Sequence, residues 1–117
     1  MTSRAIPHEA HTVIEIIAAP VLMAAAFVLG LGHSAAMITF ILGALLMGLA
    51  ISGVTETRAI PLSAHAGFDY VIATLTIFTG IAAGIAGAPP LATLFLVGFG
   101  AAHLALTAST RFSARGA

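Results

Sequence analysis

Hydrophobic residues form four long runs along this sequence, and polar residues gather between the runs and at the two ends. The runs cover residues 11–31, 35–52, 65–87 and 90–107. Each is close to the roughly 20 residues that an α-helix needs to cross a bilayer. Apolar side chains occur all round each run, without the alternation of a β-barrel strand. The pattern therefore predicts four membrane-spanning helices.

Short polar turns divide these helices into two hairpins. Glycine, histidine and serine at 30–34 separate the first two runs, with Ser34 a candidate N-cap of the second helix. Gly-Ala-Pro-Pro at 87–90 separates the last two runs. A longer polar connection, 53–63, joins the pairs, so we expect a first two-helix unit in residues 1–54 and a second in residues 55–117.

The two units are copies of one another. Residues 4–11 read RAIPHEAH and residues 58–65 read RAIPLSAH, a spacing of 54, while the later runs 49–52 and 104–107 match at 55. Two helices per copy give both copies the same orientation in a membrane. The expected fold is an all-α membrane protein, with two tandem helical hairpins related by a pseudo-two-fold axis along the membrane normal.

Composition supports a membrane environment and excludes several classes of function. The 117 residues are 60% hydrophobic and 7% charged, whereas soluble domains carry about 25% charged residues. There is no cysteine, which excludes disulfides and thiolate metal sites. No basic tract or glycine-rich phosphate loop is present, so we expect the lipid bilayer as a partner and no nucleic acid.

Arginines indicate the orientation. Arg4, Arg58, Arg111 and Arg115 all fall at the termini or in the connection between the hairpins, and the sequence has no lysine. An even number of spans places these segments on one side of the membrane. The positive-inside rule then predicts a multi-pass protein with both termini in the cytoplasm.

Two histidine–acid pairs are candidates for chemistry. His11 and Glu15 are four residues apart, as are His65 and Asp69, so each pair projects from one helix face. If the pseudo-symmetry brings the pairs together, two imidazoles and two carboxylates form a ligand set that suits zinc or iron. His8 could add a further ligand.

Other interpretations of these pairs stay open. Arg4 and Arg58 could neutralise the acids in a purely structural arrangement. Glu15 and His103 could begin a path for protons or ions in a small oligomer. Axial haem ligation by His11, His65 or His103 is conceivable, but there is no haem attachment motif. We predict no cofactor, and a metal ion is the one that the sequence leaves possible.

Small residues and a proline mark expected features of helix packing. Gly80 and Gly84 form a small-xxx-small pair that lets a neighbouring backbone approach closely. Pro20 lies inside the first run and removes a backbone donor, which predicts a kink in that helix.

The sequence resembles the small bacterial membrane proteins of the SPW-repeat type. The resemblance rests on IPHEAHTVIEIIAAP in the first copy, IPLSAHAGFDYVIA in the second, and the closing ALTASTRFSAR. That family repeats two spanning helices, the first with a Ser-Pro-Trp motif, which here reads Ala19-Pro20-Val21 and Ala73-Thr74-Leu75. It implies a bacterial four-helix protein of the inner membrane and brings no activity or catalytic residues.

No nucleophile–base set appears in the sequence, so we do not expect an enzyme. The glycine- and alanine-rich helix faces favour tight helix contacts. We expect a non-catalytic accessory, scaffold or interaction protein that packs with itself as a homo-oligomer or with a larger membrane complex. Metal binding and proton or ion conduction are the alternatives.

Overall fold

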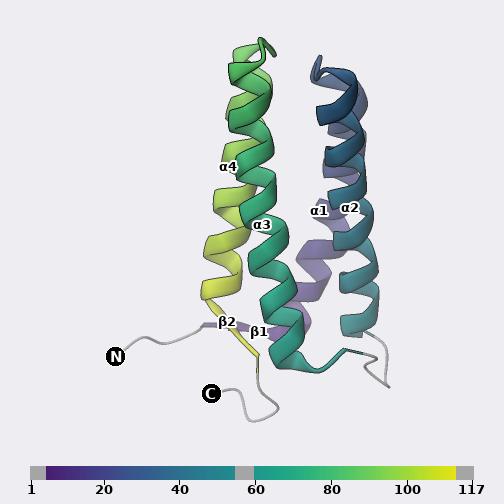
Figure 1. Ribbon diagram of the computed structural model, residues 1–117. Coiled ribbons are helices and arrows are strands. Elements are labelled where there is room, and N and C mark those ends of the chain that lie inside the picture. Colours follow the sequence, from purple (N-terminus) through teal and green to yellow (C-terminus); the bar gives the residue numbers. More distant parts are fainter. Residues whose placement is uncertain (1–4, 55–59, 113–117) are drawn as a thin grey trace.

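The computed structural model, which describes residues 5–54 and 60–112, contains four helices and two short strands (Figure 1). The helices are α1 (His8–Val28), α2 (His33–Val54), α3 (Leu62–Ile85) and α4 (Pro90–Ala108). Each is long and apolar enough to cross a membrane. The prediction of four helices with the composition of membrane spans is confirmed.

Prolines mark three of the helix starts, and α1 and α3 begin earlier than the predicted runs while α4 begins at the predicted residue. Pro7 and Pro61 directly precede α1 and α3, and Pro90 is the first residue of α4. Proline suits a helix start because its fixed φ is helical and its missing N–H would have no partner there. α2 begins at His33, so the prediction of Ser34 as its N-cap was wrong.

Glycines set the helix ends. α1 ends at Val28 and α3 at Ile85, before the predicted 31 and 87. Gly30 and Gly87 follow with φ of 72° and 103°, a left-handed backbone that glycine adopts without strain and that stops a helix.

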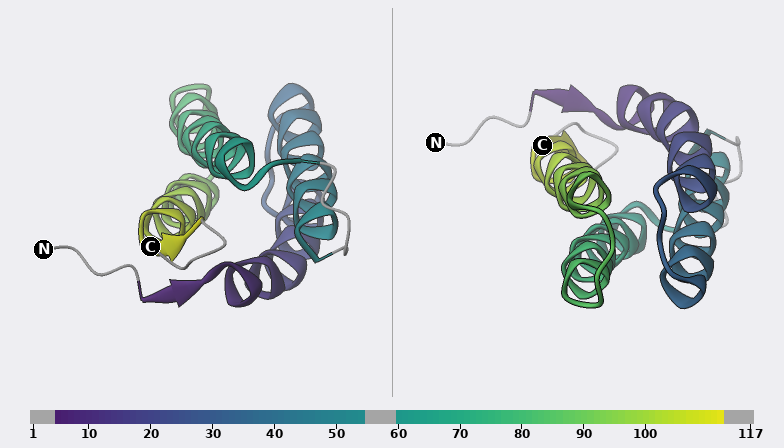
Figure 2. Two further views of the ribbon diagram at one scale, coloured as in Figure 1. Left: turned by 90° about the horizontal axis from the view of Figure 1, so that it is seen from below. Right: turned by 90° about the horizontal axis from the view of Figure 1, so that it is seen from above.

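The helices pack as two hairpins. α1 packs along α2 to form the first hairpin, α3 packs along α4 to form the second, and α2 and α3 make the main contact between the two. Figure 2 shows this arrangement from both ends of the bundle. The predicted hairpin packing is confirmed.

Glycines bring the paired helices into close contact. A Cβ at Gly80 would lie 2.8 Å from the Cβ of Leu96, and one at Gly84 would overlap the hydroxyl of Thr93. The Thr93 hydroxyl donates a hydrogen bond of 3.0 Å to the Gly80 carbonyl oxygen. The small residues of α3 therefore face α4, within the second hairpin.

Buried positions repeat along the chain at a spacing of 54. In α1 and α3 the buried pairs are His11/His65, Glu15/Asp69, Ala19/Ala73, Leu22/Thr76 and Ala26/Gly80. In α2 and α4 they are Leu42/Leu96, Leu46/Gly100, Leu49/His103 and Gly53/Thr107. The sequence match at 55 would instead pair the buried Ala50 with the exposed Ala105, so burial follows one constant register.

Two short strands, which the sequence pattern did not predict, join the beginning of α1 to the end of α4. β1 (Ile6–Pro7) and β2 (Thr110–Arg111) pair in parallel. The Ile6 N–H also donates to the Ser109 carbonyl oxygen at 3.0 Å. Both strands lie at the same end of the bundle (Figure 1), which we call the strand end; the opposite end, with the two hairpin turns, is the loop end.

The outer surface of the helices is apolar. Phe27, Val28 and Ile85 are more than three-quarters exposed. α1 continues through Pro20, whose side chain is exposed, and the predicted kink stays a prediction. Arg4 and Arg58, expected beside the acids, lie outside the described residues.

Candidate metal centre

Two carboxylates are buried between the hairpins near the strand end. Glu15 of α1 is 1% exposed and Asp69 of α3 is 0% exposed. Isolated buried carboxylates cost several kcal/mol of solvation free energy, so each requires partners that supply positive charge or hydrogen bonds. Among the described residues, the ion-pair partners found for both are histidines.

Three imidazoles direct their Nε2 atoms at these two carboxylates. His11 Nε2 lies 2.8 Å from Glu15 Oε2 and 2.9 Å from Asp69 Oδ2. His65 Nε2 lies 3.3 Å from Glu15 Oε1 and 3.3 Å from Asp69 Oδ2. His103 Nε2 lies 3.0 Å from Glu15 Oε2 and 2.9 Å from Asp69 Oδ1. We call these five residues the imidazole–carboxylate cluster.

Thr110 fixes the tautomer of His11. The Thr110 hydroxyl donates to the Leu106 carbonyl oxygen at 2.6 Å, so it has only lone pairs left for His11 Nδ1, which lies 2.8 Å away. His11 must therefore donate from Nδ1. A neutral His11 then presents the lone pair of Nε2 to two carboxylate oxygens. Such an arrangement is repulsive unless a proton or a metal ion lies between the three atoms.

His103 has the opposite arrangement. Its Nδ1 is buried without a hydrogen-bond partner in the described part of the chain. A buried N–H without an acceptor is rarer than a buried lone pair without a donor, so the proton belongs on Nε2. From there it donates to Glu15 and Asp69, and His103 orients the two carboxylates.

The remaining four residues form a group that could hold a metal ion. Each of His11, Glu15, His65 and Asp69 offers one ligand atom, and these atoms lie within 4.8 Å of one another. Metal–ligand bonds of about 2.0–2.1 Å put neighbouring ligand atoms about 2.9 Å apart in an octahedron and about 3.4 Å apart in a tetrahedron. The contacts between these imidazoles and carboxylates run from 2.8 to 3.3 Å, close to these spacings and also within hydrogen-bonding distance.

Charge and ligand type also fit a divalent ion. Two carboxylates bring two negative charges, which one divalent cation would neutralise. Two imidazoles with two carboxylates suit zinc or iron among the biological metals. The Nδ1–H of His11 bound to Thr110 is the outer contact that metal-ligating histidines usually make.

Aromatic rings and a close helix contact cover the cluster at the strand end. The ring of Phe112, just after β2, lies 5.1 Å from that of His11 and 5.9 Å from that of His65. His8 lies edge-on to His65 at 4.7 Å between ring centroids. A Cβ at Gly53 of α2 would lie 3.0 Å from His65 Cε1. These contacts fix the imidazoles and keep the cluster buried.

The four residues predicted from the two sequence repeats lie together in space, one pair from each hairpin. His103 was predicted only as a possible start of a proton or ion path with Glu15, and not as a member of the ligand set. Its counterpart at a spacing of 54 is Leu49, so the repeat gave no signal for a third histidine. The predicted path from Glu15 and His103 would next meet the apolar core of Leu22, Leu42, Leu46 and Leu96; conduction stays a prediction.

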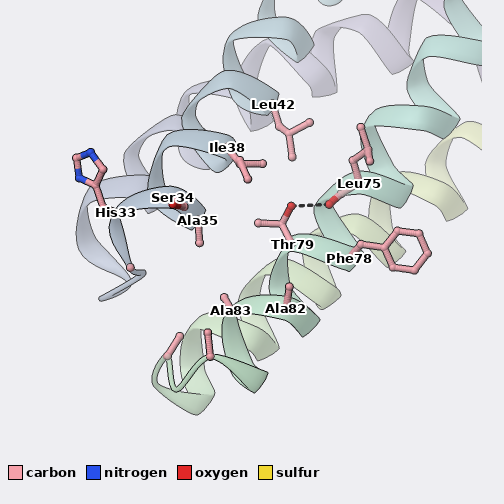
Figure 3. Close-up of a pocket in the computed structure, with 13 residues that line it drawn as sticks. His33, Ser34, Ala35, Ile38, Leu42, Leu75, Phe78, Thr79, Ala82 and Ala83 are labelled. Atoms are coloured by element: carbon pink, nitrogen blue, oxygen red, sulfur yellow. Dashed lines mark hydrogen bonds between the residues drawn. The ribbon is translucent and has the colours of Figure 1, made fainter.

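Cavities bordered by described residues lie at both ends of the bundle. A small one of about 160 Å³ borders Glu15 and His103. A larger one of about 670 Å³ lies between α2 and α3 at the loop end (Figure 3). None of the residues that line the larger cavity is an acid or an arginine. In the described part of the chain, the buried acids Glu15 and Asp69 thus lie near the strand end and away from this cavity.

Comparison with models of protein families, with curated proteins and with solved structures finds no match to this chain. The resemblance to the SPW-repeat type therefore stays a prediction, and the function is argued from the geometry above.

Proposed function

We propose that this chain is a non-catalytic, accessory integral membrane protein that holds a divalent transition metal ion, zinc or iron, between its two helical hairpins. The observation that carries the proposal is the position of His11 Nε2, which lies within 2.9 Å of two carboxylate oxygens while Nδ1 is committed to Thr110. A metal ion bound to Nε2 and the two carboxylates would remove the repulsion that a neutral His11 otherwise meets, which is the role a proton on Nε2 would have in the metal-free protein. His11, Glu15, His65 and Asp69 would be its ligands.

The ion would act as a cross-link. Two of its ligands come from α1 and two from α3, and the main direct contact between the hairpins is that of α2 with α3. A metal ion would add a link between α1 and α3 to the packing of α2 with α3 and the pairing of β1 with β2. Metal binding of this kind contributes its free energy directly to folding, which suits a scaffold better than a catalyst.

The membrane setting is part of the proposal. The exposed apolar side chains of all four helices support a lipid environment, and the burial repeat at a spacing of 54 supports a pseudo-two-fold axis along the membrane normal. Arg111 lies at the strand end, which favours a cytoplasmic location for this end in the inner membrane. Packing with a second copy or with a larger membrane complex stays the expected mode of assembly.

Metal content and affinity test the proposal. Protein purified without chelator should contain about one zinc or iron ion per chain by elemental analysis. Glu15→Gln and Asp69→Asn should each weaken binding by about 100-fold or more, because losing a ligand costs more than losing an outer contact. Glu9→Gln is the matched control, since Glu9 is an exposed acid in the first turn of α1.

Two outcomes would overturn it. One is wild-type protein, folded and never treated with chelator, that neither contains a metal nor binds one on titration. The other is equal loss of binding in Glu9→Gln and Glu15→Gln, which would place the ion outside the cluster.

A further inference from the structure

The larger cavity is a groove between the two hairpins. It has a volume of about 670 Å³ and is lined along α2 from His33 to Leu42 and along α3 from Leu75 to the C-cap residue Ala86. Figure 3 shows these two faces opposite one another. At a rise of about 1.5 Å per residue, the lining covers roughly 14–17 Å of each helix. That is half of the roughly 30 Å hydrocarbon core of a bilayer, the depth of one leaflet.

The lining has the chemistry of a lipid site. Most of it is alanine, leucine, isoleucine and phenylalanine side chains or glycine backbone. The Thr79 hydroxyl is already satisfied, since it donates to the Leu75 carbonyl oxygen at 2.7 Å (Figure 3). Deep in the groove, a ligand therefore meets apolar surface and gains little from polar groups of its own.

The mouth of the groove is polar. His33 and Ser34 border it at the loop end, where the proposed orientation places the outer membrane surface. α2 also begins there, and the first turn of a helix favours an anionic group. A molecule that fills the groove would thus have its polar end at the mouth and its apolar part inside.

The volume of the groove is comparable to that of one acyl chain. A methylene group takes up about the volume of a water molecule, roughly 30 Å³. A chain of about 16 methylenes therefore takes up roughly 500 Å³, which is comparable to the volume of this groove, open on one side.

We propose that this groove is a binding site for one acyl chain of an outer-leaflet phospholipid, which lies between α2 and α3 with its phosphate near His33 and Ser34. The lipid fills the gap between the hairpins at the loop end and completes their packing there. The site depends on the membrane setting proposed above and is independent of the metal ion.

The chain has no tryptophan, so one introduced tryptophan can serve as a fluorescent reporter for the test. Phe78 lines the groove and is 60% exposed, and Phe27 lies on α1 outside the groove and is 76% exposed. Phe78→Trp and Phe27→Trp each give a single-tryptophan protein with a lipid-accessible ring. The probe is a phosphatidylglycerol with brominated acyl chains, titrated into delipidated protein in detergent, with free brominated fatty acid as the second arm.

Quenching of Phe78→Trp should saturate at about one phospholipid per chain, whereas quenching of Phe27→Trp should rise without saturation. Adding Ala82→Phe, at an exposed lining position, should raise the half-saturation concentration about tenfold or more, because the new ring takes the place of several methylenes. Adding Ala44→Phe to Phe78→Trp, at an exposed position of α2 outside the groove, should leave the half-saturation concentration unchanged.

Other results would overturn the proposal. Quenching that never saturates in Phe78→Trp would mean that the groove holds only exchanging bulk lipid. Fatty acid that saturates more tightly than the phospholipid would replace the proposed ligand by a free carboxylate lipid. A metal-loaded protein with no saturable quenching would remove this site while leaving the metal proposal intact.

Discussion

Replacing Thr110 by valine tests the central claim about His11 without touching a ligand. The Thr110 hydroxyl accepts the His11 Nδ1–H at 2.8 Å, and valine keeps the shape of the side chain but has no acceptor. The buried N–H then loses its only partner found in the described part of the chain. Leaving a buried donor unpaired costs about 1–3 kcal/mol, which corresponds to roughly 5- to 150-fold in an equilibrium constant. Losses of about 10- to 100-fold are typical for the outer partner of a metal-ligating histidine.

The assay is a competition titration of Zn²⁺ against a chromophoric chelator in detergent, with thermal unfolding in the presence and absence of metal. We expect Thr110→Val to weaken zinc binding by about 10- to 100-fold and to reduce the stabilisation that the metal gives. Thr107→Val is the matched control, because Thr107 is equally buried and its hydroxyl has no hydrogen-bond partner among the described residues. Equal zinc affinities for Thr110→Val and wild type would refute the tautomer assignment and the argument built on it.

Two further predictions concern glycines where helices meet. Gly53→Ala places a methyl group against the Thr12 methyl and beside the cluster, and should destabilise the protein by about 1–3 kcal/mol. Gly48→Ala, with open space around its Cβ, should stabilise it by about 0.5–1 kcal/mol. Unfolding in sodium dodecyl sulfate measures both changes. Gly100→Ala directs its methyl group at the Ala73 carbonyl oxygen, 2.8 Å away, and should lower the stability by about 1–3 kcal/mol. Gly98→Ala, which is also in open space, should not lower it. Equal stability within either pair would contradict the close packing described for those helices.

The sequence alone determined the elements and their grouping. Four apolar runs of spanning length, divided by glycine and proline turns, were sufficient to predict four helices in two hairpins. The repeat then selected His11, Glu15, His65 and Asp69, because equal spacing within each copy puts histidine and acid on one helix face. These features are local, so they can be read from the order of residues.

Only the tertiary structure decided which polar groups meet. His103 joins the cluster because it lies on the buried face of α4, which packs against α3. The residue at the corresponding position of the first copy is the apolar Leu49, so the repeat gives no sign of this contact. Thr110 reaches His11 across 99 positions because β2 pairs with β1. The groove between α2 and α3 likewise depends on how the two hairpins pack against one another. Periodicity along a chain sets the face of a helix on which a residue lies, but not the helix that the face will meet.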